Sequence, residues 1–291
     1  MSTLILLTFT GLGLGALYFL VASGLSLIYG LMGVLNFAHG SFLTLSAFAG
    51  FEVGRRLGAG TFTGFFGSIL VGAVVGGIFA AVTELLLIRP LYKRHIEQLL
   101  VTVGLSLATV ALFEGIWGPD PIFLDSSGWL RETTEILGAR IPNDRFVTIL
   151  AAILVLGGLV LFLNKTRYGL IIRAGVENRS MVTALGIDVR RAFTLVFTIG
   201  GIAAGIGGVL ASHFFGYVSP LLGGSLLIFA FIVTVIGGMG SLAGAAIASV
   251  LVALLQQFAN FYLGIGDFIV VLLLGVVLLV RPQGLLGKAA A

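Results

Sequence analysis

Apolar stretches of about 20 residues recur along nearly the whole chain of 291 residues, and only short polar intervals separate them. A helix of this length crosses the roughly 30 Å hydrocarbon layer of a bilayer. Hydrophobic residues make up 58% of the chain and charged residues only 10%, which excludes an ordinary soluble domain. The sequence therefore predicts an all-α, polytopic integral membrane protein in which residues 1–291 form a single transmembrane domain.

We expect roughly eight to ten membrane-spanning segments. The first apolar run has no Lys or Arg ahead of it and is too long for a signal-peptide core, so it is predicted to be a retained helix. The expected spans lie near residues 4–29, 33–53, 62–88, 97–117, 146–164, 192–215, 222–237, 241–260 and 262–280.

The distribution of charge predicts which polar intervals face the cytoplasm. Residues 89–95 and 164–191 hold nine of the 16 Lys and Arg, as expected of cytoplasmic loops. Residues 118–145 carry five Asp or Glu against three Arg, which favours the outer face. The "GRRLG" of residues 54–58 would then face outward against the rule, so the orientation of the N-terminus stays open.

The chain offers no catalytic constellation. It has no Cys, which excludes disulfides and thiolate metal sites, and three His without metal-ligand spacing. It has no P-loop and no paired carboxylates beside a nucleophile. We therefore expect no enzyme activity, no metal site and no cofactor in this chain.

Glycine is abundant, with 43 residues, and much of it recurs at four-residue spacing inside apolar runs. Small residues allow helices to approach closely in lipid, where packing drives helix association. The pairs therefore predict tight helix crossings. They are Gly11 and Gly15, Gly72 and Gly76, and Gly201 and Gly205.

Two glycine-rich interruptions stand at similar places, "YGLMGVLNFAHGSF" at residues 29–42 and "GGMGS" at residues 237–241. Each follows an apolar run and leads into a helix of small residues, so residues 30–51 and 237–258 resemble a weak internal duplication. Such interruptions predict broken helices around a central pathway. The candidate pathway residues are Asn36, His39, Gly40, Gly237, Gly238, Gly240 and Ser241. For Asn36 and His39, capping a helix or hydrogen bonding between helices is the alternative.

Three carboxylates, Glu84, Glu114 and Asp267, fall within or at the ends of apolar runs. Ionisable groups are costly there, so each is a candidate for proton relay or ion coupling. Each also lies near an expected membrane interface, where it could snorkel or form a pair, and this placement favours an anchoring role.

The 28-residue interval 164–191 is long for a simple turn between two spans. Residues 173–187 contain apolar positions between charged ones, and Gly186 is suited to ending a helix. This pattern predicts a short amphipathic helix that docks into a groove on a soluble motor. A helix lying on the lipid surface is the alternative.

The sequence resembles the permease family of branched-chain amino acid ABC importers, of the LivH type, over nearly its whole length. The resemblance rests on "YGLMGVLNFAHGSF", "ELLLIRPLYKR", "RYGLIIRAGVENRSMVTALGID", "GGMGSLAGAAI" and "RPQGLLG", in this order. It implies that residues 177–186 correspond to the loop that contacts an ATPase. With the amphipathic pattern, it gives the candidate coupling residues Arg173, Glu177, Asn178, Met181, Ala184, Leu185 and Gly186.

The resemblance also implies a function and partners. The subunit would form a translocation pathway in the bacterial or archaeal plasma (inner) membrane for branched-chain amino acids or a related small polar solute. A second similar permease, two cytoplasmic ATPases that bind ATP and Mg, and an external solute-binding protein would complete the importer. Urea, short amides and aromatic acids are alternative solutes within this family. An ion-coupled secondary carrier or a channel remains a different class of function.

Overall fold

The computed structural model describes residues 2–33, 35–58, 60–92, 94–124, 128–130, 132–177, 179–184, 186 and 189–287. Helices dominate it, and the prediction of an all-α polytopic membrane protein is confirmed. The long helices and the apolar shorter ones are α1 (Ser2–Met32), α2 (His39–Leu57), α3 (Phe62–Thr83), α4 (His95–Trp117), α5 (Asn143–Lys165), α8 (Val189–Phe215), α9 (Leu222–Gly237), α10 (Leu242–Leu263) and α11 (Gly266–Val280).

Within the described residues, six helical segments are long and apolar enough to cross a membrane, and α9 and α11 are shorter apolar helices. Helix α2 is more polar because it ends with Arg55 and Arg56 in its last turn. The remaining helical pieces connect longer helices. They are the π-helical turn η1 (Glu84–Ile88), the 3₁₀ turn η2 (Arg89–Leu91), α6 (Arg167–Glu177) and α7 (Arg179–Ala184).

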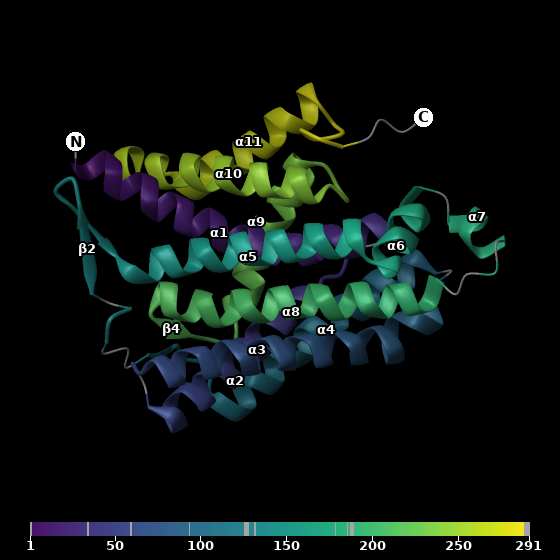
Figure 1. The fold of residues 1–291 in the computed structure, drawn as a ribbon, viewed down its shortest axis with the longest axis horizontal. Coiled ribbons are helices and arrows are strands. Elements are labelled where there is room, and N and C mark those ends of the chain that lie inside the picture. The colour runs from purple at the N-terminus through teal and green to yellow at the C-terminus, as the bar shows by residue number, and fades with distance from the viewer. Residues whose placement is uncertain are drawn as a thin grey trace.

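Short strands lie at one end of the helices. β1 (Ile122–Phe123) pairs with β4 (Tyr217–Val218), and β2 (Thr133–Ile136) pairs with β3 (Ala139–Pro142), both antiparallel. Figure 1 shows these strands and the N-terminus at the left of the molecule, which we call the strand end. It shows α6, α7 and the C-terminal segment at the right, where the interval that follows α3 also lies, and we call this the basic end.

The two ends agree with the division of charge read from the sequence. The described parts of residues 118–145 belong to the strand end, and those of residues 164–191 belong to the basic end. Arg55 lines a cavity together with Ile122 of β1, so the "GRRLG" segment lies at the strand end as the sequence indicated. Helix α1 also begins at the strand end. The start of α1 therefore lies on the side of the strands, opposite α6 and α7.

Glycines set the closest helix crossings. A Cβ built on Gly72 would lie 3.1 Å from the carbonyl oxygen of Gly205, so α3 and α8 pack backbone to backbone. Gly76 and Gly201 meet in the same crossing. A Cβ on Gly15 would lie 3.0 Å from the carbonyl oxygen of Ser249, which brings α1 against α10. The three predicted glycine pairs thus serve helix packing, as expected.

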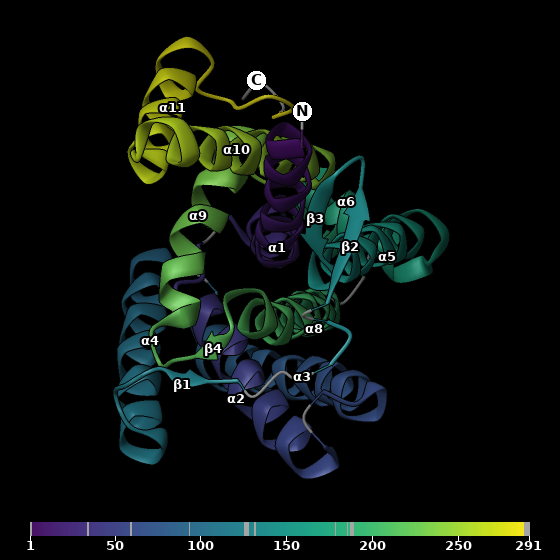
Figure 2. The ribbon, with the colours of Figure 1, turned by 90° about the vertical axis from the view of Figure 1, so that its left-hand side faces the viewer.

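Figure 2 views the molecule from the strand end and shows how α9 is placed. It runs obliquely from the side of α2 and α4, past α1, toward α10. It packs against α1, α2 and α10. One short helix therefore links the two sides of the bundle, and both predicted interruptions lie beside it.

Candidate translocation and coupling sites

The first interruption turns the chain back into the bundle. Helix α1 ends at Met32, but His39 at the start of α2 donates through Nε2 to the carbonyl oxygen of Val21, at 3.1 Å. Val21 precedes Met32 by eleven residues, or ~16 Å at the rise of an α-helix. Helix α2 therefore starts at depth, beside the middle of α1.

Polar side chains hold this turn. Asn36 Oδ1 accepts a hydrogen bond from the backbone N–H of Ala38 at 3.0 Å. Asn36 is 2% exposed and His39 is fully buried. Among the described residues, Asn36 Nδ2 and His39 Nδ1 have no hydrogen-bond partner. His39 thus forms the bond between helices that the alternative described, whereas Asn36 bonds to Ala38 within the turn and does not cap α2. A role of either residue in a pathway stays a prediction.

Gly40 lies in a very close crossing with α9. A Cβ on Gly40 would lie 2.7 Å from the carbonyl oxygen of Gly223, and a Cβ on Gly223 would collide with Gly40 in return. Thr44 Oγ1 accepts from the backbone N–H of Gly223 at 2.9 Å and donates to the carbonyl of Gly40 at 3.2 Å. Only glycines allow this hydrogen-bonded contact between α2 and α9.

The second interruption is a tight turn between α9 and α10. Gly238 and Gly240 have φ values of +100° and +86°, which favour glycine. Ser241 Oγ accepts from the backbone N–H of Gly244 at 3.0 Å and caps α10. Gly237 packs against Gly244. The sequence thus places this turn correctly, between two helices.

The C-terminal segment closes this second turn. The backbone N–H of Leu285 donates to the carbonyl of Ile236 at 2.7 Å, and that of Leu286 donates to Gly237 at 3.0 Å. Gly284 and Gly287 lie against Gly238. The "RPQGLLG" motif therefore supplies donors to the carbonyls at the end of α9, which lack partners within the helix.

The two interruptions share α1 but contact it at different depths. His39 bonds to Val21, whereas a Cβ on Gly30 would lie 3.0 Å from the Cα of Gly240. Val21 and Gly30 are nine residues apart, or ~14 Å along the helix. That the two turns line one solute path remains a prediction.

The coupling segment forms two helices rather than one. Helix α6 begins at Arg167, six residues before the expected Arg173, and α7 is separate. Figure 1 shows α7 at the outermost part of the basic end. Met181 is 61% exposed and Ala184 is exposed, while Val182 is 4% exposed and faces the protein.

The remaining candidate coupling residues are placed only in part. Arg173 is exposed and donates to Asn164 Oδ1 at 3.0 Å. Gly186 is exposed with φ +76°, consistent with its expected place after a helix. Glu177 is the last residue of α6. Asn178 and Leu185 lie outside the described residues.

Comparison with known proteins identifies the family. The model of the family described as "Branched-chain amino acid transport system / permease component" matches residues 7–281. The chain belongs to this family. It is therefore a permease subunit of an ABC importer, a multi-pass membrane protein that serves transport.

Individual relatives agree with this assignment. The chain is 31% identical to the high-affinity branched-chain amino acid transport system permease protein LivH of Escherichia coli K12, over 96% of this chain and 94% of the relative. It is 30% identical to LivH of Salmonella typhimurium and 28% to BraD of Pseudomonas aeruginosa, with the same coverage. No solved structure matches the chain significantly.

A buried charged cluster holds the basic end of this permease together. Glu84, fully buried, accepts from Thr194 Oγ1 of α8 at 2.8 Å and pairs with Arg89 at 3.4 Å. The Tyr92 hydroxyl also donates to Glu84. Burial, and then the Glu84 carboxylate, raise the pKa of Tyr92 above its usual range, so the hydroxyl stays a donor.

This cluster bears on the two predictions for Glu84. The carboxylate pairs with Arg89, as the anchoring prediction allowed, and it does so inside the protein rather than by snorkelling to water. Its role stays a prediction. Glu114 is exposed on α4. Sequence reasoning missed Thr194, because its contact with Glu84 joins residues 110 positions apart.

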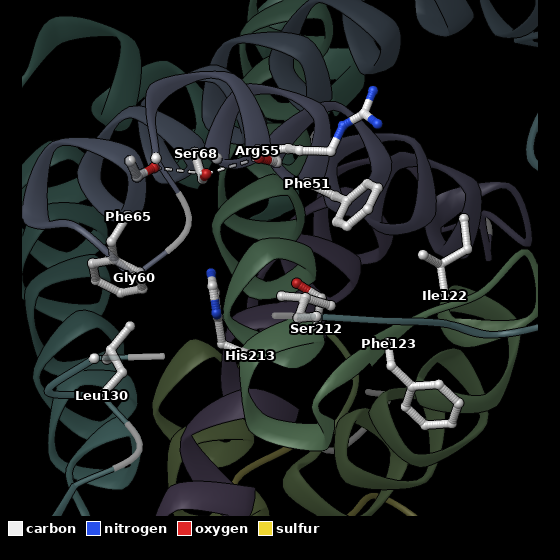
Figure 3. Close-up of a pocket in the computed structure, with 16 residues that line it drawn as sticks. Phe51, Arg55, Gly60, Phe65, Ser68, Ile122, Phe123, Leu130, Ser212 and His213 are labelled. Atoms are coloured by element: carbon white, nitrogen blue, oxygen red, sulfur yellow. Dashed lines mark hydrogen bonds between the residues drawn. The ribbon is translucent and has the colours of Figure 1, made fainter. Parts of the chain in front are cut away.

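Two cavities lie outside the predicted pathway residues. The first, of about 210 Å³, lies at the strand end between α2, α3, α8 and β1. Figure 3 shows Phe51, Phe65 and Leu130 around it, with His213 pointing inward. The ring of His213 meets Phe65 edge on, at 5.2 Å between centroids. The walls are mainly apolar.

The second cavity, of about 270 Å³, lies between α1, α9, α10 and α11. Its polar residues include Tyr18, Gln256 and Asp267, which are linked by hydrogen bonds. Asp267 was noted in the sequence, but Tyr18 and Gln256 were missed. The adjacent Gln256 and Gln257 inside an apolar run were the available signal, because polar side chains are costly in a membrane.

Proposed function

We propose that this permease subunit carries branched-chain amino acids across the bacterial or archaeal plasma (inner) membrane, as part of a heteromeric importer. The match over residues 7–281 carries this proposal, because relatives that cover 96% of the chain bear that activity in their names. The subunit would pair with a second, homologous permease. An external binding protein would deliver the solute at the strand end.

Two cytoplasmic ATPases would dock at the basic end and hydrolyse ATP with Mg. The exposed Met181 and Ala184 on α7 support this, because an apolar surface at the tip of a basic loop fits a groove on a soluble partner. Residues 164–191 would then be the coupling loop and residues 118–145 the outer loop of one transmembrane domain. The positive-inside rule supports this orientation.

A pathway through the two interruptions is the second element of the proposal. Asn36, His39 and Gly40 stand where α2 begins beside the middle of α1, and Gly237 to Ser241 form the turn at the base of α9. Broken helices at membrane depth support a solute path, since their free backbone ends suit polar groups.

Co-expression with the neighbouring importer genes tests the motor and the solute together. The tagged chain should bring down both ATPase subunits in mild detergent, and proteoliposomes should take up leucine with ATP and the loaded binding protein. Excess isoleucine or valine should compete, whereas urea, acetamide and phenylacetate should not. Competition by one of those solutes alone would assign the permease to another substrate class.

A matched pair of variants tests the docking surface. Met181→Asp places a carboxylate in the proposed contact, and Leu137→Asp makes the same kind of change at the strand end, where Leu137 is 83% exposed. We expect only Met181→Asp to lower ATPase copurification and the stimulation of ATP hydrolysis by binding protein. Equal behaviour of the two variants would remove α7 from the coupling contact.

A further inference from the structure

The cavity between α1, α9, α10 and α11 reaches the strand end of the permease. Tyr217 of β4 is one of its lining residues, and β4 pairs with β1 at that end. Leu14 and Tyr18 of α1 line it together with Leu226 and Phe229 of α9. The cavity therefore adjoins the oblique helix that links the two sides of the bundle.

A chain of hydrogen bonds fixes the polar side of this cavity. The Tyr18 hydroxyl donates to Gln256 Oε1 at 2.7 Å, and Gln256 Nε2 donates to Asp267 Oδ1 at 2.7 Å. Tyr18 is 2% exposed and Gln256 is 8% exposed. Tyr18 also stacks on Phe229, with ring centroids 5.2 Å apart. Asp267 itself is exposed, and the buried Gln256, backed by Tyr18, binds one of its carboxylate oxygens.

Asp267 lacks a cationic partner within the described part of the chain. The ion pairs there involve Glu52, Glu84, Glu97 and Asp144. A carboxylate in the first turn of α11 suits the helix dipole, but that alone gives no reason for the buried Tyr18 and Gln256. A carboxylate on the wall of a cavity that has both polar and apolar sides is suited to receiving a cation.

Gly266 allows α11 to begin in close contact with α10, next to Gln256. A Cβ on Gly266 would lie 2.7 Å from the carbonyl oxygen of Gln256 and 2.8 Å from Cβ of Asn260. Gly266 is buried. The start of α11 can therefore touch α10 only because residue 266 is glycine, and this contact places Asp267 beside Gln256.

We propose that this cavity is the site where the permease receives its solute from the outer side. Asp267, positioned by Gln256 and Tyr18, pairs with the ammonium group of the amino acid. Leu222, Leu226 and Phe229 of α9 contact the aliphatic side chain. The assignment rests on the proposed function and adds to it the place where the solute is received and the residue that pairs with its ammonium group.

The transporter assembled with its second permease and ATPases, in lipid nanodiscs without binding protein, tests recognition directly. Saturation-transfer NMR is recorded with leucine, with 3-methylbutylamine, which keeps only the ammonium, and with 4-methylpentanoate, which keeps only the carboxylate. We expect signals from leucine and 3-methylbutylamine and a much weaker one from 4-methylpentanoate. Asp267→Asn should reduce the first two roughly tenfold, since a charged hydrogen bond becomes a neutral one.

The matched control is Glu114→Gln, which neutralises an exposed carboxylate on α4 outside the cavity. It should leave binding unchanged. Leucine uptake in proteoliposomes should also fall roughly tenfold in Asp267→Asn, because the same contact is lost. ATPase copurification and stimulation of ATP hydrolysis by loaded binding protein should be retained.

Three outcomes overturn the inference. They are equal binding of 4-methylpentanoate and leucine, wild-type binding and uptake by Asp267→Asn, and no leucine signal from the wild type. Failure of the proposed function is recognised separately, because the wild-type transporter would then take up no branched-chain amino acid with its binding protein. If the wild-type transporter takes up leucine and Asp267→Asn binds and transports it equally well, the site assignment alone is wrong.

Discussion

At the interruption between α1 and α2, side chains form the hydrogen bonds that hold the turn. At the turn between α9 and α10, backbone N–H groups from a distant segment form them. Asn36 and His39 supply the hydrogen bonds at the first place. Leu285 and Leu286 supply them at the second through their N–H groups. The unpaired backbone groups of two similar glycine-rich interruptions are therefore satisfied differently, by side chains at the first and by backbone donors at the second.

This difference predicts different sensitivities to substitution. The first interruption should respond to changes of side-chain chemistry and to added volume where α2 meets α9. The second should tolerate changes of side chain in the C-terminal segment and fail when a backbone donor is removed.

The largest effect is expected for Gly40→Ala. The new Cβ would lie 2.7 Å from the Gly223 carbonyl oxygen, so α2 and α9 must separate, at a cost of roughly 3 kcal/mol. Thermal unfolding in detergent and leucine uptake should both be impaired. The control is Gly224→Ala, because a Cβ there has nothing within 4 Å. Equal unfolding temperatures for the two variants would contradict the close crossing.

Leu286→Pro should be the next most damaging change. It removes the N–H that donates to Gly237 and leaves that carbonyl without its partner, a loss of roughly 2 kcal/mol. Leu286→Ala keeps the donor and shortens a side chain that is 49% exposed, so it should be nearly neutral. The comparison is made by thermal unfolding. If Ala is as harmful as Pro, the side chain rather than the backbone closes the turn.

His39→Phe should cost about 1 kcal/mol, because the bond to the Val21 carbonyl is lost while the aromatic volume is kept. His39→Gln retains a donor and should be milder. Uptake measured beside unfolding separates structure from transport. A loss of uptake far larger than the loss of stability would support contact with the solute, and a proportional loss would support the structural role.

The smallest effect is expected for Asn36→Ala, roughly 0.5 kcal/mol. The lost bond to the Ala38 N–H is partly offset, because the unpaired Nδ2 atom is also removed. Asn36→Ser keeps an uncharged oxygen acceptor for the turn and serves as the matched control. Chemical denaturation in mixed micelles compares the two. A more stable Ala variant would show that the turn does not depend on this side chain.

The sequence was sufficient where a local rule decides the structure. The four-residue glycine spacing located the crossing of α3 and α8, since only small residues fit there. The turn from Gly237 to Ser241 was recognisable from its glycines, whereas the cap that Ser241 supplies to α10 appeared only in the structure. The sequence predicted the amphipathic stretch near Met181, but not which side of it faces the protein. Helix α7 has only six residues, too few to define a face, and the structure shows that Val182 is the buried residue.

Contacts between distant residues could not be read from the sequence. Tyr18 and Gln256 are 238 positions apart, and no pattern in a single sequence indicates that they form a hydrogen bond. The depth at which α2 begins depends on the bond between His39 and Val21, which no hydropathy profile contains. The oblique course of α9 likewise depends on the fit between Gly40 and Gly223.

The closure of the second turn by the C-terminal segment has a consequence for biosynthesis. Leu285 and Leu286 leave the ribosome only after α10 and α11 have been made, so the carbonyls of Ile236 and Gly237 enter the membrane before their donors exist. Helices α9 to α11 must therefore reach their final arrangement after insertion, as one unit. A chain that stops before residue 285 would leave the carbonyls of Ile236 and Gly237 without these two donors.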